Sequence, residues 1–298
     1  MKAKFTFLHL LSLSLLLVLP LAGPSVADDT LIQVLDTGCI DWSAGTVRAR
    51  GVAAPATLDD GESPDSPSDI IDSARRMAQA NLMGTASAIP INAVSRVADR
   101  MAQSTDFRDG LRTLARNASL SHQEYLSDGT VEIELTMNLT GGFSQFVLPE
   151  EIRQVDSVVT MTATEPDADK PSMPATGSDG SPHTGLILDA TGIGARPSLV
   201  PVVVDESGDV VYGPAFVSRE FAVSRGMSGF ATTLAAARRD KRVGDHPLVV
   251  KAIRTRSTGA TDLVVSSADG ARLRSSVVHL NFLKACRVSI VIDPEAAP

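Results

Sequence analysis

At residues 127–140 the sequence reads SDGTVEIELTMNLT, which is the clearest secondary-structure signal in the first half of the chain. From Val131 to Leu139, apolar residues alternate with Glu, Thr and Asn. This two-residue period is typical of a strand with one buried face and one solvated face. The preceding Asp128-Gly129 pair is a strong hairpin-turn signal. The stretch therefore predicts an antiparallel hairpin in which residues 123–126 form the partner strand.

Upstream of the hairpin, the sequence predicts one or two strands and then three helices. Residues 31–52 are extended and interrupted by glycine, which is typical of one or two strands with a tight turn. Ser66 suits the cap and Pro67 the first position of the first helix, which must end or kink at Pro90. The second helical run covers 91–101 and the third covers 106–118. Apolar spacing predicts the buried face of the first helix: Ile70, Ile71, Ala74, Met77, Ala78, Leu82 and Ile89.

The region after residue 184 has the same mixed character. The patterns predict strands over 186–188, 199–204, 210–212, 248–253, 262–265 and 288–292, and helices over 216–224, 230–239 and 267–283. Between the halves, residues 165–183 contain four prolines among small polar residues, which is typical of a linker. We therefore predict an α+β protein with two small domains, 28–164 and 184–298, each a mainly antiparallel sheet packed with helices.

Residues 1–27 are typical of a cleavable secretory signal peptide. Lys2 and Lys4 precede a long apolar run, and small residues follow up to a cut between Ala27 and Asp28. The alternative is a retained membrane anchor, against which the proline and glycine breaks near the end of the run argue. Cleavage would change the net charge from −8 to −10, which disfavours nucleic acid and anionic lipid as partners. We expect a periplasmic or secreted protein without a transmembrane helix in its mature chain.

The chain contains two cysteines, Cys39 and Cys286, one near each end of the mature sequence. An even number of cysteines in an oxidising compartment suggests a disulfide. The alternative is that both are small buried apolar residues. The sequence leaves both interpretations open, since it does not give the separation of the two Cα atoms.

The sequence contains no recognisable set of catalytic residues. Gly226–Phe230 approaches the Gly-x-Ser-x-Gly pattern in the wrong register, the histidines are isolated, and no Cys-x-x-Cys occurs. Residues 191–197 contain Gly-x-Gly without the third glycine of a dinucleotide loop. The basic cluster at 238–242 indicates a solvated helix end, or else a contact with an acidic partner or glycan. We therefore predict no enzyme activity, no cofactor, and no catalytic, cofactor-binding or metal-binding residues.

Two parts of the chain resemble known bacterial proteins. The first part contains the alanine-spaced helix Ala74–Ala88, the helices after it, and the segments Val131-Glu132-Ile133-Glu134-Leu135 and Leu139-Thr140-Gly141. Together these features resemble the N-terminal domain of the flagellar assembly protein T. That domain is shared with a family of small bacterial surface lipoproteins, and the resemblance covers roughly 40–145. The second half, from Thr184-Gly185-Leu186-Ile187-Leu188-Asp189-Ala190 onward, resembles a domain of uncharacterised bacterial envelope proteins. The chain departs from the lipoproteins because it lacks their lipid-attachment motif.

The resemblance implies a non-enzymatic periplasmic or surface role in building or bracing an envelope assembly such as the flagellar basal body. We therefore expect a protein that binds other envelope proteins, including flagellar or outer-membrane components. The alternative is a module that binds an envelope glycan or a small ligand. Docking is expected through a sheet edge or an exposed face of residues 184–292. Pro201 disfavours the strand over 199–204, and 248–253 is the better candidate if it lies at an edge.

Overall fold

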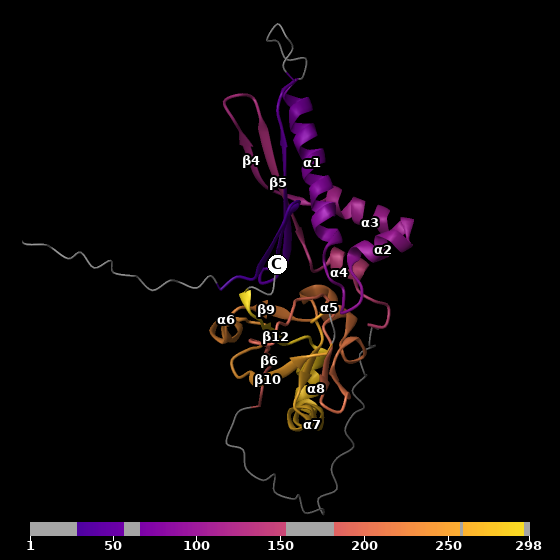
Figure 1. The fold of residues 1–298 in the computed structure, drawn as a ribbon, viewed down its shortest axis with the longest axis vertical. Helices are drawn as coiled ribbons and strands as arrows, with labels where there is room; N and C mark the ends of the chain where they lie inside the picture. Colours follow the sequence, from indigo (N-terminus) through magenta and orange to yellow (C-terminus); the bar gives the residue numbers. More distant parts are fainter. Residues whose placement is uncertain (1–28, 57–65, 153–181, 257–258, 295–298) are drawn as a thin grey trace, which may run out of the picture.

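The computed structural model describes residues 29–56, 66–152, 182–256 and 259–294, which form two sheets packed with helices (Figure 1). The predicted α+β class is confirmed. Among the described residues, no helix combines the length and the apolar character needed to cross a membrane. The predicted cut between Ala27 and Asp28, and all of the predicted linker except residues 182–183, lie outside the described residues.

The first sheet is antiparallel and contains five strands. They are β1 (Ile32–Leu35), β2 (Gly38–Asp41), β3 (Thr46–Ala53), β4 (Ser119–Tyr125) and β5 (Val131–Asn138), in the order β1-β2-β3-β5-β4. The predicted hairpin is confirmed, since β4 pairs antiparallel with β5. Its turn has Gly129 at φ +84°, a left-handed conformation that favours glycine. The Asp128 carboxylate stabilises the turn by accepting a hydrogen bond from the Thr130 N–H at 2.9 Å.

Helix α1 (Pro67–Ser87) covers the inner face of this sheet, over β3 and β5 (Figure 1). It begins as predicted, with the Ser66 hydroxyl accepting from the Asp69 N–H. Small residues bring the helix unusually close to β3, where Ala49, Gly51 and Ala53 alternate on the buried face. Most of the predicted helix face is buried, but Met77 is an exception at 46% exposure.

Three further helices complete the first half: α2 (Val97–Gln103), α3 (Thr105–Arg116) and α4 (Gly142–Val147). The prediction of a helical run over 91–101 is wrong in its first six residues. There the Asn92 side chain accepts the N–H groups of Val94 and Ser95, which stabilises a turn in place of a helix. Helix α4 was not predicted, because its sequence is too short to show a helical period.

The second sheet contains seven strands in the order β8-β7-β11-β10-β6-β12-β9. Its strands are β6 (Leu186–Asp189), β7 (Val203–Asp205), β8 (Val210–Tyr212), β9 (Gly229–Ala231), β10 (Leu248–Thr255), β11 (Leu263–Val265) and β12 (Val288–Val291). The prediction that this sheet is mainly antiparallel is wrong. Only β7–β8 and β10–β11 are antiparallel, whereas the other four pairs are parallel.

Helices connect several strands of this sheet. The helices are α5 (Arg219–Arg225), α6 (Leu234–Arg239), α7 (Ser267–Ser275) and α8 (Val277–Lys284), with a short 3₁₀ turn η1 (Pro214–Phe216). The connections through α5 and α6 return the chain in the same direction, so β8, β9 and β10 point the same way. In contrast, α7 and α8 lead from β11 to β12, which points the opposite way. Of the predicted helix over 230–239, the first residues belong to strand β9 and only the later ones form α6. The predicted helix over 267–283 is divided into α7 and α8 at Ser276, whose backbone is extended.

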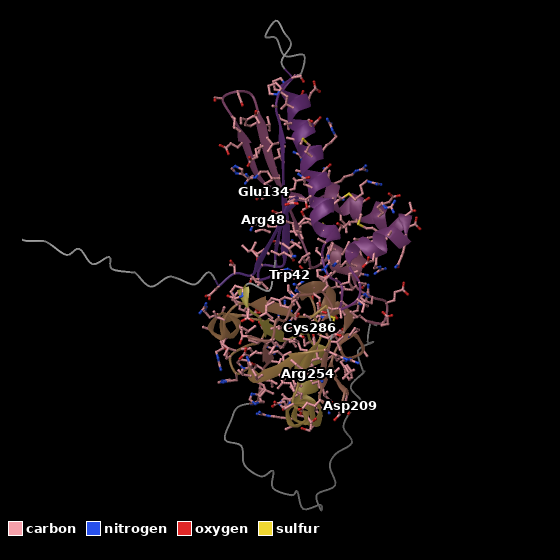
Figure 2. All side chains as sticks on the ribbon, in the orientation of Figure 1. Trp42, Arg48, Glu134, Asp209, Arg254 and Cys286 are labelled. Atoms are coloured by element: carbon pink, nitrogen blue, oxygen red, sulfur yellow. The ribbon has the colours of Figure 1, made fainter. Side chains whose placement is uncertain are left out.

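The two halves share one connected hydrophobic core. At their boundary the Trp42 ring meets the Phe230 ring edge to face, with centroids 5.6 Å apart and planes at 75°. Figure 2 labels Trp42 at this boundary and Cys286 below it in the second half. The halves therefore pack on each other through apolar side chains.

Candidate functional site

The longest open strand edge of the described residues is β4. The edge strands of the two sheets are β1, β4, β8 and β9, and β4 has seven residues against four, three and three for the others. Six of its seven residues are exposed. The β4–β5 hairpin reaches away from the second half, with α1 beside β3 and β5 (Figure 1). An edge strand presents unpaired N–H and C=O groups, so β4 is able to accept another strand.

The two faces of β4 differ in chemistry. On the face it shares with the buried residues of β5, it carries Leu120 and Tyr125, which are 46% and 62% exposed. On the other face it carries His122 and Glu124, opposite Glu134 and Glu132 of β5. A bulge between Leu120 and His122 interrupts the ladder, so the regular part of the edge is 122–125.

The acidic face of β4 has the residue types of a metal site. Among the described residues, His122, Glu124 and Glu132 form the group whose ligand atoms all lie within 4.8 Å of one another. However, the Arg50 Nε lies 2.9 Å from a Glu132 carboxylate oxygen, and His122 Nε2 lies 3.5 Å from Glu124. The arginine already compensates one carboxylate, so we interpret the group as a cross-strand charge cluster that is acidic on balance.

The expected docking edge in the second half is wrong. Strand β10, which covers the predicted 248–253, lies between β11 and β6 and is paired on both sides. Its backbone groups are therefore not open to a partner. Pro201 lies just before β7, which is also internal, between β8 and β11. The sequence did not distinguish these strands from edges because strand order is set by pairings between distant residues.

Hydrogen bonds to main-chain carbonyls join the two halves. The N–H groups of Leu199 and Val200 donate to the carbonyls of Pro90 and Ile91 at 3.0 and 2.8 Å. The Arg219 guanidinium donates to three carbonyls of the first half: Gln145 at 2.9 Å, Pro149 at 2.9 Å and Ile152 at 3.3 Å. These bonds hold the halves in one arrangement.

Between the halves lies a cavity of about 180 Å³, which we call the junction cavity. Its apolar wall comes from both halves and includes Trp42, Leu139, Leu148, Leu199, Met227 and Phe230. Its polar lining includes Ser198, Ser228, Arg225, Asp240 and Arg242. The site was missed at the level of sequence, where the only signal was the basic cluster at 238–242.

Arg242 is a structural part of the cavity wall. Its guanidinium donates to the carbonyls of Gly226 at 3.0 Å and Cys286 at 3.3 Å, and also to Arg225 O. Its side chain is only 16% exposed and lies 3.7 Å from the Asp240 carboxylate. Burial lowers the pKa of Arg242, an effect that the nearby Asp240 charge opposes. The basic cluster is therefore only partly the solvated helix end that the sequence indicated.

The two cysteines are both free in the structure. Cys39 is half-buried on β2 in the first sheet, and Cys286 is fully buried just before β12 in the second half. The disulfide that the sequence suggested is thus not formed, and Cys286 fits the alternative of a small buried residue. Burial raises the pKa of the Cys286 thiol to about 11, although the Tyr212 hydroxyl beside it acts in the opposite direction.

This environment predicts unequal reactivity of the two thiols. With a pKa near 11, only about one in a thousand Cys286 side chains is ionised at pH 8, and burial blocks access. We expect iodoacetamide to label one thiol, Cys39, in the folded protein and two after unfolding. Intact mass followed by peptide mapping measures this. A cross-linked peptide without reductant, or equal labelling of both thiols, would contradict it.

The comparisons with known proteins concern the second half. Residues 185–294 match the family model for the second domain of Treponema pallidum Tp0624, an uncharacterised bacterial family. The predicted likeness of this half to an uncharacterised bacterial family is therefore confirmed. No curated protein matches the chain at a significant level. The predicted likeness of residues 40–145 to the flagellar assembly protein T stays a prediction.

Proposed function

We propose that this protein is a non-enzymatic component of the bacterial envelope that binds another envelope protein by strand addition at β4. The observation that carries the proposal is an edge strand of seven residues, exposed on nearly its whole length and free of proline. In strand addition, main-chain hydrogen bonds supply affinity and alternate side chains supply specificity. The proposed location, periplasmic or secreted, rests on the signal-like residues 1–27.

The chemistry of β4 defines the partner segment. The acidic face of His122, Glu124, Glu132 and Glu134 favours lysine or arginine at alternate positions of an added strand. The opposite face, with Leu120 and Tyr125, favours apolar residues at the positions between. The net charge of −8 also favours a basic partner segment. We therefore propose an extended segment that alternates basic and apolar residues, carried by an envelope assembly of the flagellar type.

The first experiment uses a peptide of about ten residues that alternates lysine and valine. We expect binding that protects the amides of β4 from hydrogen exchange. A control peptide with the same charge but a central proline should bind at least about tenfold more weakly, because it breaks the added strand. Equal binding of both peptides, or protection outside β4, would reject strand addition.

Matched variants test the role of the acidic face. Glu124→Lys reverses a charge on β4, whereas Glu150→Lys makes the same change at an exposed residue after α4. We expect the β4 variant to lose at least about tenfold in peptide affinity and the control to lose little. Comparable losses in both would indicate attraction by overall charge only.

A second candidate function, binding of a small ligand, is favoured by the junction cavity. Concave sites between packed units, apolar with a few polar groups, are the usual form of ligand sites. The junction cavity has this composition. The two functions use separate surfaces, so one protein is able to carry both.

A further inference from the structure

Two serines at the wall of the junction cavity have buried hydroxyls that lack hydrogen-bond partners within the described part of the chain. Ser198 is 1% exposed, and its Oγ has no partner. The Ser228 Oγ is also buried without a partner. Both residues line the cavity. Since buried hydroxyls are nearly always hydrogen-bonded, these two leave hydrogen-bonding capacity for a polar molecule at the cavity.

The cavity also carries one uncompensated positive charge. Arg242 is balanced by Asp240 and saturated by main-chain carbonyls. In contrast, the Arg225 guanidinium packs over the Phe221 ring at 5.1 Å and makes no side-chain hydrogen bond or ion pair with another described residue. Arg225 lines the cavity. A cavity with a free guanidinium and two free hydroxyls attracts an anion.

The size and walls of the cavity restrict the kind of anion. About 180 Å³ holds roughly ten heavy atoms or fewer, either a whole small molecule or the end of a larger one. Seven of the lining side chains are apolar, including the two rings Trp42 and Phe230. A phosphate dianion would place two charges against one free guanidinium and no apolar group against these walls. A carboxylate carries one charge, matches the fork of an arginine, and offers an apolar remainder.

We propose that the junction cavity binds the carboxylate of a small apolar organic acid. Arg225 carries the charge recognition, Ser198 and Ser228 donate to the carboxylate oxygens, and Trp42 and Phe230 contact the apolar part. The inference rests on the second candidate function, ligand binding, and is independent of strand docking at β4. A free organic acid and the C-terminal carboxylate of a peptide present the same chemistry.

The single tryptophan provides the readout, because Trp42 lies in the wall of the cavity. Tryptophan fluorescence of the full chain is followed during titration with 4-methylpentanoate and with N-acetyl-leucine. Their neutral amides and inorganic phosphate are titrated in parallel. We expect saturable binding of the acids and at least about tenfold weaker binding of the amides and phosphate. Preference for N-acetyl-leucine would identify a peptide end, and preference for 4-methylpentanoate a free acid.

Variants then locate the site. Arg225→Gln is expected to weaken acid binding at least about tenfold, and Ser198→Ala several-fold. Arg238→Gln, on the exposed surface of α6, removes the same charge outside the cavity and should leave binding unchanged. Circular dichroism checks folding, and Ser198→Ala carries the test if Arg225→Gln fails to fold.

The outcomes separate the proposals. Amides that bind as tightly as the acids overturn the carboxylate assignment but leave ligand binding in place. Saturable binding of none of the probes overturns the carboxylate assignment and removes the support for ligand binding. Acid binding that persists unchanged in both Arg225→Gln and Ser198→Ala shows that the acids bind elsewhere and also overturns the proposal.

Discussion

Gly51→Ala is expected to destabilise the protein by about 3 kcal/mol. A Cβ atom at Gly51 of β3 would lie 2.2 Å from both the Ala74 carbonyl oxygen and the Ala78 nitrogen of α1. Both contacts are main-chain atoms, which cannot rotate away as a flexible side chain would. The helix must therefore move off the sheet, and the small-residue packing of the first half is lost.

The control is Gly142→Ala at the start of α4. A Cβ there would meet only the Leu114 side chain at 3.6 Å, an ordinary contact. We expect this variant to change the free energy of unfolding by less than about 1 kcal/mol. Urea unfolding followed by circular dichroism measures both. Similar stability of the two variants would show that α1 does not approach β3 this closely.

Arg242→Ala is expected to lower the free energy of unfolding by about 3 kcal/mol, because three main-chain carbonyls lose their hydrogen-bond donor at the junction. The loss should be accompanied by a change in Trp42 fluorescence, since Arg242 and Trp42 line the same cavity. Arg242→Lys should recover only part of the stability. A lysine ammonium does not reproduce the planar fork that reaches several carbonyls at once.

Arg238→Ala is the matched control for this site. Arg238 is exposed on α6, four residues before Arg242. Its loss is expected to change the free energy of unfolding by less than about 0.5 kcal/mol. Denaturant unfolding at fixed pH, with fluorescence and circular dichroism as parallel probes, distinguishes the two. An equal, small effect of Arg242→Ala would mean that the junction does not depend on this guanidinium.

Local features of the fold were predictable from the sequence. The alternation from Val131 to Leu139 predicted strand β5, and the Asp128-Gly129 pair predicted the hairpin turn. Ser66-Pro67 predicted the start of helix α1. Each of these signals depends on residues that are neighbours along the chain. Where a nearby side chain competes with the backbone, as Asn92 does before α2, the periodic signal alone was misleading.

The candidate sites were not predictable in the same way. Strand 248–253 was correctly predicted as a strand, but its central position between β11 and β6 depends on pairings with residues far away in sequence. The open edge of β4 and the junction cavity have the same origin, because Ser198, Arg225 and Trp42 meet only after both halves fold and pack.

Short-range backbone and side-chain preferences thus specified the Asp128-Gly129 turn, the Ser66 cap, the period of β5 and the mixed α+β class, which is why the sequence alone predicts them. Only long-range packing specified which strands run parallel, which long edge stays open, and which arginine of the junction cavity lacks a counter-charge. These properties depend on long-range burial and pairing, in which each residue's environment is set by partners that its local sequence does not specify.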